Sequence, residues 1–343
     1  MLVGSTALGA TAFARSDTVL VGADPVLGRH VAPVNVLMTR EEYATVRRMS
    51  REISALAGGV QPALPTVEWL VESSARGSRT LEFSQAVLRR AQVLFEQLGL
   101  VRMGRTHIVI ARTQRFINES LALLDCYPNL VRTGGVHLMG EAVCNRSVIV
   151  INLTGYYFLR SAGDVLTERM ESLPEPLFNR LNYRIADRNI SGLAHEWAHV
   201  VRASATDGVV APDEPAWMRE GFAEVMAGIA RVQAFSPRMS YATFHVVRLR
   251  KFADWGDSCG ASLGRYRIES NFFAGCEYYL GALAVEYLIA RMGGLVAIAT
   301  LFREAARSRD FSGAFRATYG MSLGAFEQRM DTYLRSIAEL PDP

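Results

Sequence analysis

The short sequence HEWAH, at residues 195–199, holds the side chains best suited to chemistry. On a helix, residues four apart lie on one face, about 6 Å apart along the axis, so His195 and His199 could bind one metal ion. Zinc accepts neutral imidazole nitrogens and lowers the pKa of water toward about 7. Glu196 lies beside the two rings and could take a proton from that water as it attacks a substrate. The spacing therefore predicts a zinc-dependent hydrolytic site.

A catalytic zinc needs a third protein ligand and leaves a fourth position open. The segment PAWMREGFAE, residues 215–224, places Glu220 and Glu224 one turn apart on a second expected helix. We interpret Glu220 as the third ligand and Glu224 as the acceptor for the N–H group of a ligating histidine. The alternative is that both glutamates lie on a solvated helix face. The segment is rich in apolar residues, however, and burying an unpaired carboxylate is costly.

These motifs resemble those of the gluzincin metallopeptidases. HEWAH followed by WMREGFAE is similar to the family's HExxH and W-x-x-E-G-x-A-E motifs, and the chain is most similar to bacterial peptidase MA-like domains. The resemblance covers residues 80–340. It implies a zincin fold, a Zn²⁺ ion bound by His195, His199 and Glu220, and a peptide or protein substrate.

The C-terminal part of the chain extends the resemblance. The stretch YYLGALAVEYL, residues 278–288, is similar to the tyrosine-led helix of that family. By this resemblance Tyr278 would stabilise the oxyanion of the tetrahedral intermediate. Tyr279 is the adjacent alternative, and either residue could instead be an ordinary core tyrosine.

Substrate specificity stays open. The aminopeptidase branch of these enzymes carries a Gly-x-Met-Glu-Asn strand that binds a free N-terminus, and the sequence MGEA at residues 139–142 is not that motif. The β-rich run at residues 147–153 could be an edge strand on which a peptide pairs, or simply a core strand.

Two other functions compete with a peptidase. The first is a ferritin-like di-iron oxidoreductase, because Glu196 and His199 match one Glu-x-x-His half of such a site. That fold needs a second Glu-x-x-His, which the sequence lacks. The second is a catalytically inactive zincin-fold protein that serves in binding.

The order of the expected elements predicts an α+β protein, with an N-terminal mixed sheet, an active-site helix and a mostly helical C-terminal subdomain. Asp213 and Pro215 are expected to cap and open the helix that carries Glu220. The expected elements are β-runs over 18–21 and 34–38, a helix over 41–56, a helix with an apolar stripe at 87–98, strands over 107–111 and 147–153, a helix over 177–201, a helix from 215 to about 230, and three or four helices in the last 70 residues.

We divide the chain into four parts: 1–35 as a leader or N-terminal segment, 36–79 as an N-terminal extension, 80–205 as the subdomain with the HExxH helix, and 206–343 as the helical subdomain with the third ligand. The first part contains an apolar stretch and an Ala-Phe-Ala sequence typical of signal-peptidase sites. No basic residue precedes Arg15, so this would be a degenerate signal peptide.

Composition excludes several classes of protein. Half of the 343 residues are hydrophobic, which argues against disorder, and 37 basic against 34 acidic residues give a net charge of +3, too small to indicate a nucleic-acid partner. The longest apolar stretch, 274–292, contains Glu277, Glu286 and Arg291 and therefore reads as a buried helix, so no integral membrane segment is expected.

Four cysteines leave the compartment undecided. Cys126, Cys144, Cys259 and Cys276 allow three pairings in an oxidising compartment and would be small buried residues in a reducing one. A secreted or periplasmic location is as well supported as a cytoplasmic one, and the oligomeric state stays open.

Overall fold

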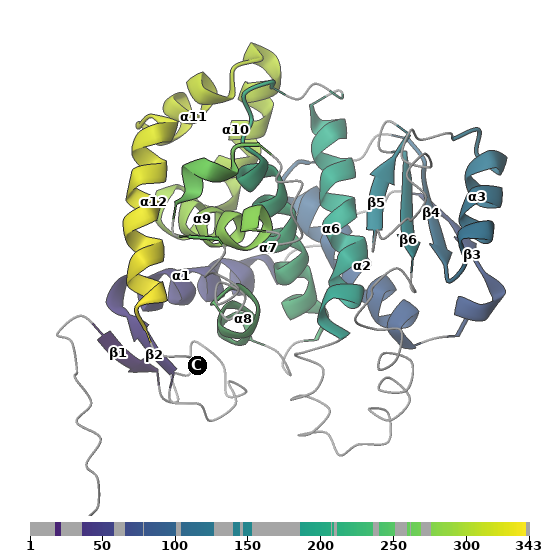
Figure 1. Ribbon diagram of the computed structural model, residues 1–343, viewed down its shortest axis with the longest axis horizontal. Coiled ribbons are helices and arrows are strands. Elements are labelled where there is room, and N and C mark those ends of the chain that lie inside the picture. The colour runs from purple at the N-terminus through teal and green to yellow at the C-terminus, as the bar shows by residue number, and fades with distance from the viewer. Residues whose placement is uncertain are drawn as a thin grey trace, which may run out of the picture.

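The computed structural model describes residues 18–21, 36–57, 66–77, 79–100, 104–126, 140–144, 147–152, 186–206, 208, 211–235, 240–250, 259–260, 262–268 and 276–340 (Figure 1). Its strands are β1 (Thr18–Val21), β2 (Val36–Thr39), β3 (Val67–Val71), β4 (Thr106–Ala111), β5 (Gly140–Val143) and β6 (Val148–Asn152). Its α-helices are α1 (Arg40–Ala57), α2 (Arg79–Gln97), α3 (Gln114–Leu123), α6 (Ala186–Ala205), α7 (Ala216–Ala234), α8 (Tyr241–Phe244), α9 (Cys276–Met292), α10 (Gly294–Ser308), α11 (Phe311–Tyr319) and α12 (Leu323–Ala338). Short 3-10 helices occur at Ser73–Ala75 and Leu263–Tyr266, and a π-helix at His245–Arg250.

The architecture is mostly helical, with a small four-stranded mixed sheet and a two-stranded antiparallel sheet of β1 and β2, which confirms the α+β class. Four helices lie within the last 70 residues, as expected, and the expected apolar stripe of α2 is buried. Gly99, at φ +64°, ends that helix in the left-handed conformation that glycine adopts without strain. Residues 1–17, 34–35, 153 and 177–185, on which parts of the leader, strand and helix predictions fall, lie outside the described residues.

The main sheet has the strand order β3-β4-β6-β5, with β3, β4 and β6 parallel and β5 antiparallel to β6. Because side chains alternate along a strand, Ile108 and Ile110 face the large core, while Val109 and Ala111 face a smaller cluster under α3. Figure 1 shows α2 and α6 on one side of the sheet and α3 on the other. Of the two alternatives for residues 147–153, the core strand is confirmed and the edge strand is not, since β6 lies between β4 and β5.

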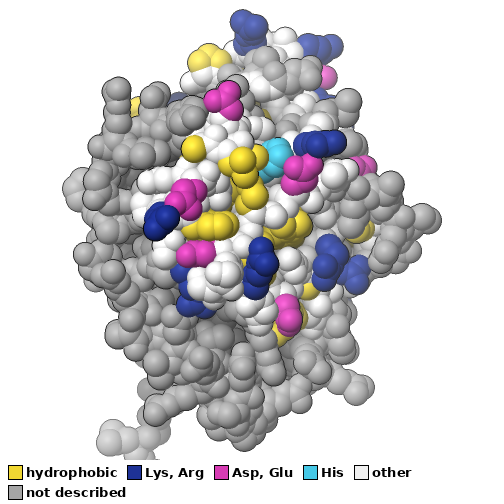
Figure 2. All heavy atoms as spheres, turned by 90° about the vertical axis from the view of Figure 1, so that its right-hand side faces the viewer, with side chains coloured by type: hydrophobic (Ala, Val, Ile, Leu, Met, Phe, Trp, Pro, Cys, Tyr) yellow, Lys and Arg dark blue, Asp and Glu magenta, His cyan; other side chains and the backbone are white. Residues whose placement is uncertain are grey.

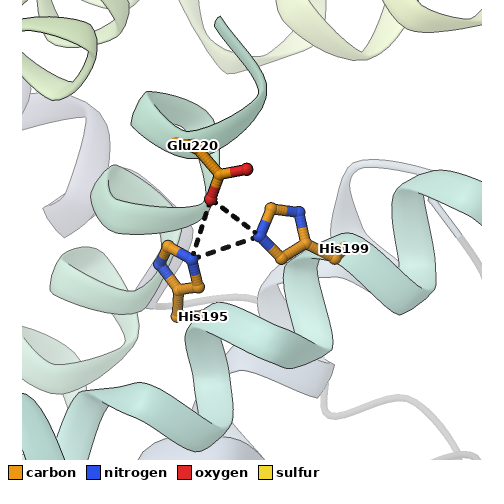
Figure 3. A group of neighbouring side chains, drawn as sticks. All are labelled: His195, His199 and Glu220. Carbon is orange, nitrogen blue, oxygen red and sulfur yellow. Dashed lines mark hydrogen bonds and ion pairs between the residues drawn. The ribbon is translucent and has the colours of Figure 1, made fainter. Parts of the chain in front are cut away.

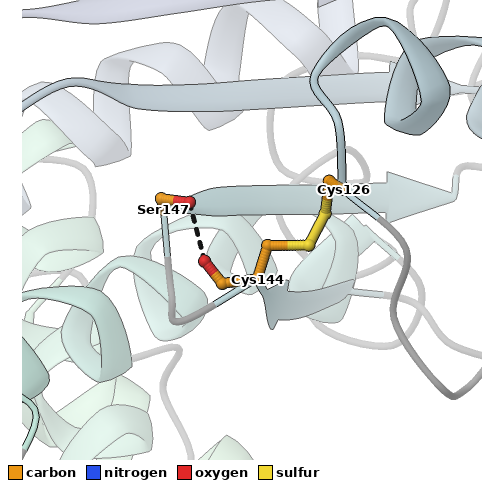
Figure 4. Close-up of a disulfide and its surroundings, with 3 residues drawn as sticks. All are labelled: Cys126, Cys144 and Ser147. Atoms are coloured by element: carbon orange, nitrogen blue, oxygen red, sulfur yellow. Dashed lines mark hydrogen bonds between the residues drawn. A yellow bond between two sulfur atoms is a disulfide. The ribbon is translucent and has the colours of Figure 1, made fainter.

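A disulfide ties α3 to the sheet. Cys126, three residues after α3, is bonded to Cys144 at the end of β5, and the Oγ atom of Ser147 donates a hydrogen bond to the Cys144 carbonyl (Figure 4). On the outer side of α3, Leu123 is 75% exposed. Figure 2 shows this side of the molecule, where basic and acidic side chains are interspersed around scattered apolar ones.

The helical part is built around α7 and α9, which lie against each other in the core. Side chains of α7 from Ala216 to Val232 are almost all buried, and so are those of α9 up to Ala290. Helix α1 precedes the sheet in the sequence but packs on α9, whereas β3 pairs with β4. The interval 36–79 is therefore divided between the helical part and the sheet.

The α7 helix starts differently from the expectation. Pro215 is its N-cap residue and makes no side-chain capping bond. The carboxylate of Asp213 instead accepts hydrogen bonds from the backbone N–H groups of Phe311 and Ser312, at the start of α11. Among the described residues, no single helix is both long and apolar enough to cross a membrane; α9 and α10 meet such a criterion only as a pair bent by 112°.

Candidate metal centre

Two packed helices bring the predicted ligands together. Helix α6 carries His195 and His199 on successive turns of one face, and α7 crosses it with Glu220 directed at the two rings (Figure 3). All three residues offer ligand atoms within 4.8 Å of one another. The structure thus joins residues that the sequence separates by 21 positions.

The three facing atoms form a compact triangle. The Nε2 atoms of His195 and His199 are 3.1 Å apart, and Oε2 of Glu220 lies 3.4 Å from the first and 3.2 Å from the second. All three side chains are at most 12% exposed. Two imidazoles and one carboxylate in a poorly solvated site are a donor set suited to a divalent cation such as zinc.

Neighbouring side chains hold the outer faces of these groups. The Nδ1 atom of His195 lies 3.2 Å from Oε1 of Glu224, one turn after Glu220 on α7. This is the contact expected from the sequence, in which Glu224 accepts the N–H group of a ligating histidine. This contact favours a proton on Nδ1 and leaves Nε2 free to act as a ligand.

On the other side of the triangle, Nε of Arg219 donates a 2.8 Å hydrogen bond to Oε1 of Glu220.

The electrostatics of the site suit a positive charge at its centre. Burial lowers the pKa of His195, but hydrogen bonds to Glu220 and Glu224 outweigh this effect and raise it to about 10. Burial lowers the pKa of His199 to about 4. The pKa of Glu220 is well below its usual value, because the interactions with His199 and His195 outweigh burial. A proton and a metal cation therefore compete for the same place.

Glu196 and Tyr278 also lie at this site. Glu196 follows His195 on α6, is half-buried, and is close enough to act electrostatically on His195. The ring of Tyr278, on the first turns of α9, stacks on the ring of His195 with a centroid distance of 5.6 Å and an interplanar angle of 21°. Tyr279, the alternative, is 5% exposed and belongs to the buried side of α9.

Comparisons of the chain with protein-family models, curated proteins and solved structures find no match.

The sequence reasoning missed the side chains that surround the predicted ligands. Arg202 lies three residues after His199 and so on the same side of α6, a spacing that could have identified it. It forms a buried ion pair with Glu214, for which the sequence offers no signal. Arg219 could have been found from its position directly before Glu220.

The second disulfide lies close to the tyrosine. Cys259 is bonded to Cys276, the first residue of α9 and only two residues before Tyr278. Together with the bond between Cys126 and Cys144, this selects one of the three pairings that the sequence left open. No free cysteine is left.

Proposed function

We propose that the chain is a zinc-dependent metallopeptidase of the gluzincin kind, with a zincin-like fold and Glu196 as the general base. The observation that carries the proposal is the convergence of His195, His199 and Glu220 on one buried point. The donor atoms are 3.1–3.4 Å apart. Zinc bonds of about 2.0–2.1 Å at tetrahedral angles require ligand atoms about 3.3 Å apart, so the spacing supports a zinc ion.

The chemistry divides between the metal and the chain. A bound zinc ion supplies a Lewis acid that polarises a peptide carbonyl and makes water easier to deprotonate. Glu196 takes the proton of the attacking water and delivers it to the leaving amine. Tyr278, held against His195, donates its hydroxyl proton in a hydrogen bond to the developing oxyanion. Glu224 keeps His195 in the ligating tautomer.

The substrate class in this proposal is a peptide or protein. With β6 inside the sheet, β3 and β5 are the two edges of the described sheet, and β5 lies against α6, the helix of the two histidines. An extended peptide could add to such an edge by backbone hydrogen bonds.

The disulfides support an oxidising compartment for this activity. Both have Cα–Cα distances, 5.7 and 5.6 Å, that are ordinary for disulfides, and together they use all four cysteines. Structural disulfides persist in secreted and periplasmic proteins and are rare in the cytosol. Mass analysis of the native protein, with and without reduction before alkylation, tests this part of the proposal.

The deciding experiment combines metal analysis with peptide cleavage. We expect one zinc ion per chain and cleavage of an unfolded protein such as casein. Glu196→Gln should keep the zinc and lose about 10²- to 10⁴-fold in rate, whereas Glu220→Ala should lose zinc. Iron in place of zinc would favour an oxidoreductase, and zinc without cleavage would favour a binding protein. If Glu196→Gln cleaved the substrate at the wild-type rate, the proposed role of Glu196 as the general base would be wrong.

A further inference from the structure

The three proposed ligands come from two helices, so the metal centre needs a fixed relation between them. The spacing of His195 and His199 is set by α6 itself. The position of Glu220, in contrast, depends on where α7 begins after the chain leaves α6 at Ala205. Whatever fixes the start of α7 relative to α6 decides whether the carboxylate reaches the two rings.

A buried ion pair spans this connection. Nη1 of Arg202, in the last turn of α6, donates a hydrogen bond to Oε1 of Glu214, two residues before α7. The two side chains are only 3% and 4% exposed. Solvent does not screen a pair in such a place, and loss of one partner would leave the other charge buried alone.

Aromatic rings extend the contact of Arg202 to α7 itself. Its guanidinium carbon lies 5.5 Å from the centre of the Phe302 ring, which is a cation–π distance. Phe302 in turn meets Phe222 edge to face, with centroids 4.8 Å apart. Phe222 lies two residues after Glu220. Arg202 therefore acts on α7 from both sides of Glu220, through Glu214 before it and through the two rings after it.

Asp213, directly before Glu214, attaches the start of α7 to a different part of the fold. Asp213 accepts backbone hydrogen bonds from the start of α11, and the backbone N–H of Ala216 donates to the carbonyl of Arg267. The start of α7 is thus attached to the helical part at two points, and Glu214 attaches it to α6.

We propose that the Arg202–Glu214 pair positions Glu220 for metal binding. This inference rests on the proposed function, because it takes the metal centre as its object. In this role the two residues touch neither metal nor substrate. They hold the start of α7 at the distance from α6 at which Oε2 of Glu220 faces both imidazoles.

A purely structural role predicts something different. A buried ion pair adds little net stability compared with a well-packed apolar pair. The double replacement Arg202→Met with Glu214→Leu can therefore keep the fold stable while removing the hydrogen bond between the end of α6 and the start of α7. A positioning role must also act through Glu220. Loss of the pair should therefore cost metal affinity when Glu220 is present and cost nothing more in a Glu220→Gln background.

The experiment measures zinc affinity by chelator competition, and the visible absorption of the Co²⁺-substituted protein, on the full chain with its disulfides intact. The variants are Arg202→Met, Glu214→Gln and the double variant Arg202→Met with Glu214→Leu, each with and without Glu220→Gln. Arg115→Met is the matched control, because Arg115 pairs with Glu119 on α3 with both side chains more than half exposed.

We expect the pair variants to lose about tenfold or more in zinc affinity and to show weaker Co²⁺ absorption. The control should match the wild type. Wild-type affinity and spectrum in a folded double variant would overturn the inference, and so would an equal loss in the Glu220→Gln background. If the double variant does not fold, Glu214→Gln, which hardly changes the side-chain volume, gives the same comparison. A wild-type chain without zinc would instead refute the proposed function.

Discussion

The backbones of Gly221 and Gly281 touch where α7 crosses α9. A Cβ atom added to Gly221 would lie 2.1 Å from the carbonyl carbon of Gly281, and one added to Gly281 would lie 2.1 Å from the carbonyl oxygen of Trp217. Gly221 directly follows Glu220, and Gly281 lies three residues after Tyr278. This crossing therefore sets the distance between the proposed third ligand and the proposed oxyanion donor.

Gly281→Ala should separate the two helices. The obstructing atoms belong to the backbone of α7, which cannot rotate away as a side chain could, so we expect a destabilisation of about 1–3 kcal/mol or more. Activity should fall further than stability alone explains, because Tyr278 moves with α9. Thermal melting and cleavage rates check this prediction. Gly192→Ala is the matched control: Gly192 lies on α6 with nothing within 4 Å of an added Cβ, and alanine there should stabilise the helix slightly.

Tyr278→Phe should distinguish the role of the hydroxyl group from that of the ring. Phenylalanine keeps the stacking on His195, so zinc content and KM should stay near the wild type. The kcat should fall by about 10²- to 10³-fold if the hydroxyl stabilises the oxyanion. Tyr279→Phe, on the buried side of the same helix turn, should change kcat little. A larger loss of kcat in Tyr279→Phe than in Tyr278→Phe would show that Tyr279, and not Tyr278, stabilises the oxyanion.

Arg219→Gln should weaken metal binding. Its guanidinium donates a hydrogen bond to Oε1 of Glu220, which leaves Oε2 facing the imidazoles. Outer contacts of this kind are worth about 10- to 100-fold in metal affinity. Chelator competition measures the change, and Arg316→Gln, at an exposed position of α11, provides the control. Unchanged affinity would mean that the helix alone orients Glu220.

The chemistry of the site could be predicted further than its surroundings. Spacing within one helix placed His195 and His199, and the motif around Glu220 indicated the third donor. Strands β3 and β5 and helix α3 were not predicted. Both runs are short, five residues in β3 and four in β5, and a glutamate interrupts each of them, whereas the four-residue run of β1, which was predicted, has no charged residue.

Contacts between distant segments could not be predicted from the sequence, for a different reason. Nothing in the order of residues says that Asp213 accepts hydrogen bonds from the start of α11 instead of capping α7, or that α1 packs on α9. Such pairings depend on which surfaces meet when the helices pack. His245 shows this most clearly: it has no partner at ligand spacing in the sequence, but in the fold it lies between two carboxylates.

The buried His245 joins three helical segments and should make the stability of the protein depend on pH. Its Nε2 atom lies 2.8 Å from Oε1 of Glu42 on α1, and its Nδ1 atom 2.9 Å from Glu286 on α9; all three side chains are fully buried. Tyr241 and Tyr333 face the same group, and burial raises the pKa of both phenols well above the usual value. They therefore stay neutral while His245 titrates.

Burial alone would lower the pKa of His245, but the charges and hydrogen bonds of Glu286 and Glu42 raise it from 6.5 to about 9. A raised pKa means that the folded state holds the proton more tightly than the unfolded state. The resulting stabilisation is complete below about pH 6.5 and is lost as the pH rises through about 9. The shift corresponds to a free energy on the order of 3 kcal/mol.

Urea unfolding of the wild type between about pH 6 and about pH 10 should therefore show the free energy of unfolding decreasing across this window. In His245→Gln the protein should be less stable at neutral pH, because two buried carboxylates lose their shared cation, and the decrease between these pH values should be smaller. His107→Gln is the control, since His107 meets Glu68 at the surface, where solvent weakens the interaction. An identical pH profile in wild type and His245→Gln would show that His245 is not held as a cation in the fold.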